Sequence, residues 1–216
     1  MTQSYTLHRM QIIDVKQVIA IHLSAFQGFF LTFLGSQFLQ ELYTAILADP
    51  TGIGFVCVYD KELNGFVVGT TQPSVLYGRL LARRWWRFGL ACIIPILKNP
   101  FIIPRLLRAF RRPQEITPLP DSGTLMSIAV LPGMQGKGIG QSLVQAFLHE
   151  SCIRGLKHVN LTTDFLNNES VNQFYSNLGF RCVRTIITPE GRKMNEYVID
   201  LPVPRLPSIP SPDNTV

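Results

Sequence analysis

The most constraining feature of this sequence is a glycine-rich loop, LPGMQGKGIGQ, at residues 131–141. Glycine lacks a side chain and loses more conformational freedom on folding than other residues, yet four glycines stand between positions 133 and 140. A strand is predicted before the loop and an amphipathic helix after it. A loop that enters a helix presents free backbone N–H groups to an anion, and Lys137 adds a positive charge. The loop therefore predicts a phosphate-binding site; the alternative is a helix entry without a ligand.

Two familiar phosphate-binding loops do not fit this segment. A Walker loop, G-x-x-x-x-G-K-[ST], has Lys and then Ser or Thr after its second glycine. Counted from Gly133, the second glycine is Gly138, but Ile139 and Gly140 follow it. A dinucleotide fingerprint, G-x-G-x-x-G, fails because Gln141 stands where the third glycine belongs. The loop therefore indicates neither nucleotide hydrolysis nor dinucleotide binding.

The rest of the chain predicts an α/β fold. Residue alternation and helical periodicity give the remaining elements. Strands are expected at 5–11, 52–60, 65–73, 121–132 and 156–164, a final hairpin at 181–201, and helices at 12–26, 35–50, 138–155 and 168–180. This order predicts a mixed sheet with helices on both faces. We expect one domain over 1–201 and a proline-rich tail over 202–216.

The pattern that does fit the loop is Q-x-x-G-x-G, with Gln135, Gly138 and Gly140. Here the chain resembles the GNAT superfamily of acetyl-CoA-dependent N-acetyltransferases, whose coenzyme A loop is [RQ]-x-x-G-x-[GA]. A later segment, NNESVNQFYSNLGF, is similar to the family's N-x-x-[AS]-x-x-[FL]-Y-x-x-x-G-F segment. The two motifs stand in the family's order. The match is close over 121–187 and only topological over 1–73.

The resemblance implies a mostly antiparallel GNAT sheet, acetyl-CoA as the donor and an amine as the acceptor. The loop amides would hold the pyrophosphate of coenzyme A, and strand 128–130 would pair with the pantetheine arm. A strand amide near Ala129 or Val130 would polarise the thioester carbonyl, and Asn168 would hydrogen-bond the pantetheine. The cofactor-binding residues expected on this basis are Ile128, Ala129, Val130, Gln135, Gly136, Lys137, Gly138, Ile139, Gly140 and Asn168.

Tyr175 and Asp164 are the candidate catalytic residues. A phenol can protonate the departing thiolate because the reference pKa values of the two groups lie within about two units, so Tyr175 is the candidate acid. The alternative is that Tyr175 only packs beneath the cofactor. GNAT proteins often carry a Glu on one of the two central strands as a base, but here these strands offer Ser127, Thr162, Thr163 and Asp164. Asp164 is the candidate base; the alternatives are a turn-forming role and a water relay.

The segment between the third and fourth strands is far longer than the short turn typical of GNAT proteins. Residues 74–120 are expected to form a helical insertion, broken at Pro95, Pro100 and Pro104. No Asp or Glu occurs from Leu63 to Gln114, while nine Lys and Arg residues do, in a chain of net charge +6. The longest uncharged apolar stretch, 88–97, is about half the length that a membrane-spanning helix needs.

Three interpretations of residues 79–112 stay open. Arginine-flanked helices with aromatic and aliphatic side chains dock on anionic membrane surfaces. The segment could instead cover an anionic or lipid-linked acceptor, such as a nucleotide sugar or a glycan intermediate. It could also form a homodimer interface or additional core. Nucleic-acid binding is not expected, because the segment is rich in aliphatic residues.

Cysteine and histidine are sparse. The four cysteines form no C-x-x-C pair and the four histidines are isolated, so no metal site is expected. The N-terminal MTQSYTLHRMQ is polar, so no secretory leader is expected, and a reducing cytoplasm fits free thiols. Charged residues make up only 16% of the chain, below the usual quarter, which favours an apolar face that meets a membrane, a partner or a second subunit.

The predicted function is transfer of an acetyl group from acetyl-CoA to an amine in the cytoplasm. An amino sugar or a surface-polysaccharide intermediate is one candidate acceptor, and the inner face of the membrane is one candidate location. The alternative function is a catalytically silent acyl-CoA-binding domain that acts as a sensor or a membrane-surface adaptor. The complete Q-x-x-G-x-G loop with Tyr175 favours the enzyme, whereas the missing strand Glu favours the sensor.

Overall fold

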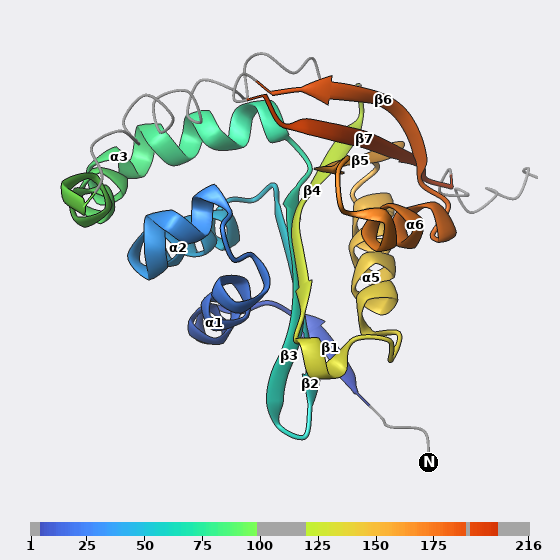
Figure 1. The fold of residues 1–216 in the computed structure, drawn as a ribbon, viewed down its shortest axis with the longest axis horizontal. Helices are drawn as coiled ribbons and strands as arrows, with labels where there is room; N and C mark the ends of the chain where they lie inside the picture. The colour runs from blue at the N-terminus through green and yellow to red at the C-terminus, as the bar shows by residue number, and fades with distance from the viewer. Residues whose placement is uncertain (1–4, 99–119, 189–190, 203–216) are drawn as a thin grey trace, which may run out of the picture.

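The computed structural model describes residues 5–98, 120–188 and 191–202. Its seven strands form one sheet in the order β1-β2-β3-β4-β5-β7-β6 (Figure 1). The strands are β1 (Thr6–Arg9), β2 (Gly52–Tyr59), β3 (Glu62–Thr70), β4 (Ser122–Val130), β5 (His158–Asp164), β6 (Arg181–Ile187) and β7 (Lys193–Asp200). All neighbouring strands are antiparallel except β4 and β5. The prediction of a mixed, mostly antiparallel sheet is confirmed.

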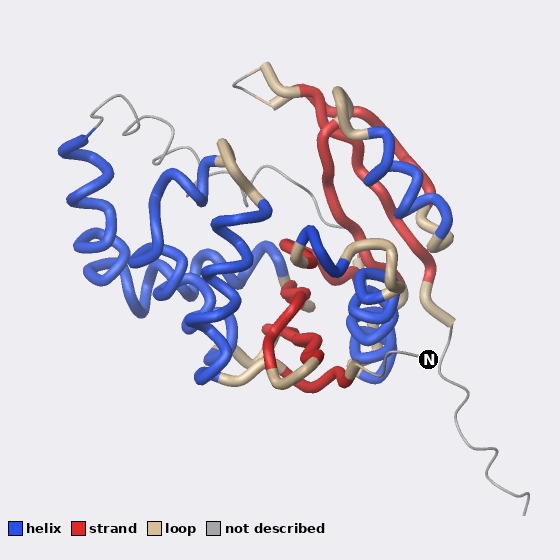
Figure 2. Tube along the Cα trace, turned by 60° about the horizontal axis from the view of Figure 1, so that its bottom comes forward, coloured by secondary structure: helices blue, strands red, loops and turns tan. Residues whose placement is uncertain are grey.

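Helices cover both faces of the sheet, as the sequence predicts. On one face lie α1 (Val15–Ala25), α2 (Phe30–Ala48) and α3 (Pro73–Lys98), and on the other lie α5 (Ile139–Ile153) and α6 (Glu169–Asn177) (Figure 1). In Figure 2 the three N-terminal helices again stay together on one side of the strands. Helix α3 follows β3 and precedes β4 in the chain, so it occupies the first half of the predicted helical segment.

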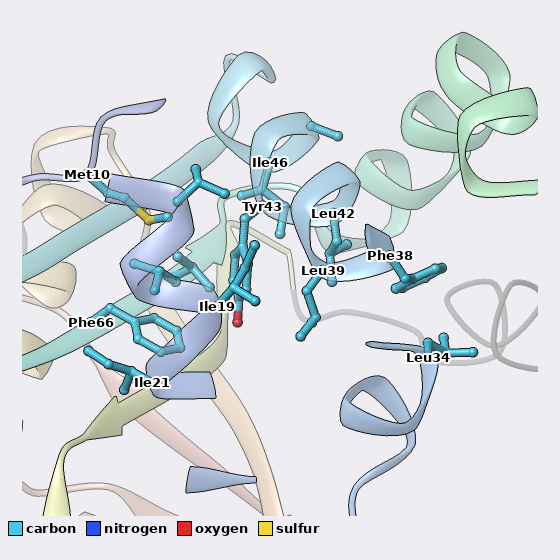
Figure 3. Close-up of a cluster of buried hydrophobic side chains, with 14 of the residues drawn as sticks. Met10, Ile19, Ile21, Leu34, Phe38, Leu39, Leu42, Tyr43, Ile46 and Phe66 are labelled. Carbon is cyan, nitrogen blue, oxygen red and sulfur yellow. The ribbon is translucent and has the colours of Figure 1, made fainter. Parts of the chain in front are cut away.

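Each face of the sheet has its own hydrophobic core. Successive side chains of a strand point to opposite faces. Accordingly Phe66 and Val68 of β3 pack against α1, α2 and α3, while Val67 packs with Phe147 of α5. Figure 3 shows the first core, in which Tyr43 of α2 lies close to Phe66 and to α1. The sheet is therefore anchored on both sides of the strands that carry the candidate site.

Two helix features differ from the sequence prediction. The helix expected at 35–50 begins earlier, because α2 starts at Phe30 and continues across a kink at Gly35, whose φ of 83° is readily adopted only by glycine. The residues before the kink add apolar side chains to the first core, which favours the earlier start. Pro95 does not end a helix; it lies inside α3, three residues before the helix ends at Lys98, and removes one helix hydrogen bond there. Pro100 and Pro104 lie outside the described residues.

Helix α3 departs from regular geometry at a different point. The departure is at Arg84, whose φ of −135° and ψ of 18° are not helical. The helix therefore consists of two parts, and the second part carries both tryptophans of the chain, Trp85 and Trp86.

Candidate active site

The centre of the sheet opens between β4 and β5. The two strands pair only at their first residues, from Ser122 opposite His158 to Thr124 opposite Asn160. The hydroxyl of Thr124 donates a 2.5 Å hydrogen bond to the Asn160 side chain at this last pair. Beyond it, β5 pairs only with β7, and β4 pairs only with β3, among the described strands. One edge of β4 therefore faces an opening rather than a neighbouring strand.

The cofactor-binding residues predicted on β4 lie along this open edge. Ile128, Ala129 and Val130 pair with β3 on one side and have no strand partner on the β5 side among the described residues. A bulge precedes them, because Ser127 pairs with Val68 and Leu125 with Gly69, which leaves Met126 as an extra residue. A bulge of this kind increases the local twist of a strand and redirects its side chains. It helps to turn β4 away from β5.

The glycine loop connects the end of β4 to α5. Gly136 and Gly138 have φ values of 75° and 80°, a region that favours glycine, and Gly138 is the N-cap of α5. An added Cβ at Gly133 or Gly136 would meet no atom within 4 Å, so the space beside the loop is open. Since the first amides of a helix have no acceptor within the helix, those of α5 are available at the mouth of this loop. The loop thus fits the anion site that the sequence predicts.

The side chains of the loop tie it to its surroundings. The Gln135 side chain lies 3.4 Å from the carbonyl oxygen of Val130, at the end of β4. The ammonium group of Lys137 lies 5.9 Å from the centre of the Tyr59 ring. Lys137 is exposed beside the loop, where it would add positive charge for a bound anion.

Asn168 lies on the opposite side of the opening, at the start of α6. Its amide donates hydrogen bonds to the Thr163 hydroxyl at 2.7 Å and to the Asp164 carbonyl at 3.2 Å. These bonds fix α6 to the end of β5. The two motifs noted in the sequence are therefore brought to the two sides of one opening in the sheet.

Tyr175 is almost completely buried on α6. Its side chain is only 5% exposed, and its ring packs against Phe174, Phe180 and Tyr197 with centroid distances of 5.2, 5.6 and 6.0 Å. Burial raises the pKa of Tyr175 to about 12. The phenol is therefore protonated at neutral pH and holds its proton more tightly than an exposed tyrosine would.

The Asp164 carboxylate forms a two-pronged ion pair with Arg192. The guanidinium donates from Nη2 at 2.6 and 2.7 Å and from Nε at 3.0 Å. The same guanidinium lies 5.1 Å from the centre of the Phe29 ring, which precedes α2. Arg192, the residue before β7, thus connects the end of β5 to the turn between α1 and α2. Asp164 would have to give up bonds to Arg192 in order to accept a proton.

A buried polar pair beneath β4 was not predicted from the sequence. His22 Nδ1 lies 2.6 Å from the Tyr43 hydroxyl, which also hydrogen-bonds Ser127 of β4. Burial lowers the pKa of His22 to about 4, and its Nε2 has no hydrogen-bond partner among the described residues. A signal was present, because His22 follows Val15 and Val18 at helical spacing and so falls on the buried face of α1.

In the described residues, no three His, Cys, Asp or Glu side chains are grouped so that they could hold a metal ion. None of the described helices combines the length and the apolar content that crossing a bilayer requires.

Comparison with known proteins agrees with this geometry. Residues 109–182 match the model of the acetyltransferase (GNAT) domain family. No curated protein matches the sequence.

Solved structures with the same fold include several acetyltransferases. One, from Desulfovibrio desulfuricans and assigned to the GNAT family, has a TM-score of 0.61 and 15% identity, and the match covers 91% of this chain and 99% of that one. The ribosomal-protein-S18-alanine N-acetyltransferase of Escherichia coli has a TM-score of 0.56 and 15% identity, and the match covers 95% of this chain and 98% of that one. The spermidine/spermine N-acetyltransferase SpeG of Vibrio cholerae has a TM-score of 0.57 and 16% identity, and the match covers 91% of this chain and 93% of that one. At these identities the likeness shows the fold.

Proposed function

We propose that the protein transfers an acetyl group from acetyl-CoA to an amine, because residues 109–182 match the GNAT acetyltransferase domain model. One observation supports this most directly: the two motifs lie on opposite sides of the opening between β4 and β5. An opening with a free strand edge and a glycine loop at its end fits a ligand that has both an extended amide-bearing arm and a phosphate group.

The residues around the opening would hold acetyl-CoA as follows. The backbone amides from Gln135 to Gly140 would bind the pyrophosphate, with Lys137 beside them. The open edge of Ile128 to Val130 would pair with the pantetheine arm as an added strand does. Asn168 would contribute a hydrogen bond from the α6 side. Acetyl-CoA would supply the acetyl thioester, whose C–S bond breaks as the bond to the amine nitrogen forms.

The reaction requires an acid that protonates the thiolate and a base that takes a proton from the amine. Tyr175 is protonated at neutral pH and would give its proton to the departing thiolate, although burial raises its pKa to about 12 and so makes it a weaker acid than an exposed tyrosine. An amide of Ala129 or Val130 would stabilise the negative charge on the thioester oxygen. Asp164 or a water molecule would take the proton from the amine. The ion pair with Arg192 favours the water, because it engages both carboxylate oxygens of Asp164.

The acceptor would enter beside Arg192. The rings of Phe29 and Phe165 are both partly exposed, and cationic side chains lie over each of them, Arg192 over Phe29 and Lys193 over Phe165. Partly exposed aromatic rings next to hydrogen-bond donors suit a sugar ring that carries hydroxyls or an anionic group. We therefore propose an amino sugar, free or within a surface-polysaccharide intermediate, as the acceptor.

We propose the cytoplasm as the place of this reaction. The four cysteines are free, and burial raises the pKa of the Cys57 and Cys92 thiols, which keeps them protonated and unreactive. Free, buried thiols suit a reducing compartment.

The test combines binding and turnover. Calorimetry measures acetyl-CoA binding, and release of free coenzyme A is then followed across a panel of amines that includes amino sugars and polyamines. Turnover with at least one amine is expected. Binding without turnover on any amine would instead support the silent acyl-CoA-binding domain, and no binding at all would contradict both.

Two variants assign the proton-handling residues. Tyr175→Phe is expected to lower kcat at least about tenfold, since it removes a general acid. Tyr59→Phe is the matched control, because among the described residues Tyr59 accepts a side-chain hydrogen bond only through its backbone carbonyl, and the variant keeps the ring that faces Lys137. Unchanged turnover in Tyr175→Phe would show that this residue only packs. Asp164→Asn is expected to lower kcat by less than Tyr175→Phe; an equal or larger loss would identify Asp164 as the base.

A further inference from the structure

The second part of α3 carries apolar side chains on two opposite sides. The inner side packs on the first core, where Phe88, Ala91 and Cys92 are buried and the Phe88 ring lies 5.3 Å from that of Phe38 in α2. This contact accounts for one side of the helix only. A soluble surface helix normally has one apolar side and one polar side.

The outer side of this part of α3 is exposed. Trp86, Leu90, Ile93 and Leu97 are spaced by four, three and four residues, which places them along one side of a helix. Their exposed fractions are 50%, 57%, 47% and 77%, and neighbouring Trp85 is 69% exposed. We call these five side chains the outer face of α3. Contiguous exposed apolar side chains of this size indicate a surface that meets a membrane or a partner.

A groove adjoins the outer face. It has a volume of about 680 Å³ and lies between α1, α2 and α3, with Trp86 and Leu90 in its lining. Lys16 and Arg87 also line it, together with Glu41 and polar side chains of α2. The outer face is therefore continuous with a recess that has apolar side chains and more cations than anions.

Positive charge exceeds negative charge around the outer face. Arg84 and Arg87 share one carboxylate, that of Glu41, at 3.6 and 3.5 Å. Arg83 is exposed and has no ion pair among the described residues. The surrounding sequence, Leu63 to Gln114, contains no acidic residue. A second copy of this chain would bring like charges together, whereas an anionic surface would neutralise them.

We infer that the outer face of α3 docks on an anionic phospholipid bilayer. The helix would lie along the interface, with its aromatic and aliphatic side chains among the headgroups and upper acyl chains and its arginines at the phosphates. Trp is well suited to this position, because its ring is apolar and its N–H is polar. No helix among the described residues is fit to cross the bilayer, so this contact is with one leaflet. The inference does not depend on acetyl transfer.

The chain offers a direct probe of this contact. Its only tryptophans, Trp85 and Trp86, both belong to the outer face, so tryptophan emission reports on this face alone. The full-length protein is mixed with vesicles of phosphatidylcholine, or of three parts phosphatidylcholine to one part phosphatidylglycerol. We expect sedimentation with the anionic vesicles, a blue shift of the emission, quenching by brominated acyl chains, and loss of binding at high salt.

Paired variants locate the contact. Ile93→Ser with Leu97→Ser is expected to weaken binding to anionic vesicles at least about tenfold, because two apolar side chains leave the interface. Ile153→Ser with Ile187→Ser, which changes two other exposed apolar side chains away from α3, is expected to leave binding unchanged. Thermal unfolding of both double variants checks that each still folds.

Three results would overturn the inference. The first is no binding to anionic vesicles at low salt. The second is binding without a change in tryptophan emission, which would mean that another surface meets the lipid. The third is a concentration-dependent dimer, measured by sedimentation equilibrium, that dissociates in the Ile93→Ser and Leu97→Ser double variant while lipid binding stays the same. The outer face would then contact a second copy of the chain.

Discussion

The glycine loop and helix α3 use glycine in opposite ways. In the loop, Gly136 and Gly138 have positive φ values, which residues with side chains rarely adopt. In α3, Gly78 and Gly89 lie in a helix without positive φ, and an added Cβ at either would meet no atom within 4 Å. The backbone conformation of the loop therefore requires glycine at these positions, whereas the backbone of α3 does not. Helix α3 differs instead in its exposed apolar side chains, which no described residue covers.

The largest expected effect lies at Gly69, a crowded position of β3 beside the β4 bulge. An added Cβ there would overlap the Thr124 carbonyl oxygen and lie 2.6 Å from the Phe147 ring. Gly69→Ala is expected to lower the free energy of unfolding by about 3 kcal/mol or more, since a well-packed core cannot take extra volume. Denaturant unfolding measures this, with Gly78→Ala in α3 as the control. Equal stability of the two variants would contradict the contrast between the sheet and α3.

A pH-dependent effect is expected at the buried pair His22 and Tyr43. The pKa of His22 is about 4 in the folded protein and near 6.5 when unfolded, so the folded state prefers the neutral ring. Above pH 6.5 the His22 ring is neutral in both states and does not oppose folding. As the pH falls toward 4, the unfolded state binds the proton first, and the free energy of unfolding decreases. His22→Gln should therefore show a shallower fall of Tm between pH 6.5 and 4 than the unmodified protein. A slope parallel to that of the unmodified protein would show that His22 does not titrate in this range.

A smaller effect on folding, but a specific one on binding, is expected at Gly138. Left-handed backbone costs a residue with a Cβ about 1–2 kcal/mol, so Gly138→Ala should lower stability by this amount. If the loop binds the pyrophosphate, the distorted amides should also raise the Kd for acetyl-CoA about tenfold, which calorimetry measures. Gly133→Ala is the matched control, because Gly133 has neither a positive φ nor a close neighbour. Unchanged affinity in Gly138→Ala would remove the loop from the binding site.

The loop region could be predicted from the sequence because its constraints are local. The glycines, the strand before them and the helix after them are adjacent in the chain, and α5 begins at Ile139, as expected. The contacts that the sequence did not reveal join distant segments. The pair His22 and Tyr43 links α1 to α2, and Arg192 links β7 to Asp164 and to the turn before α2. Such contacts depend on the packing of helices and the register of strands, which residue patterns do not specify.

The geometry of helix α3 also could not be predicted from residue patterns. Prolines suggested breaks, but the departure from helical geometry lies at Arg84, which no residue pattern marks. Composition did indicate an apolar, basic segment. Which apolar side chains face inward depends on where α2 lies, so the separation of Phe88 from Leu90, Ile93 and Leu97 became visible only in the structure.

The smallest expected effect, and the only stabilising one, is at Gly89 in α3. Ala has a higher helix propensity than Gly by about 0.8–1 kcal/mol, and no neighbouring atom opposes a methyl group at this position. Gly89→Ala should therefore raise Tm by about 2–4 °C in a chain of this size. The added methyl group lies beside the outer face, so lipid binding should be kept or slightly increased. Calorimetric unfolding and vesicle sedimentation measure the two effects. A loss of stability would show that Gly89 is required by its backbone, as Gly138 is, and the contrast between the loop and α3 would no longer hold.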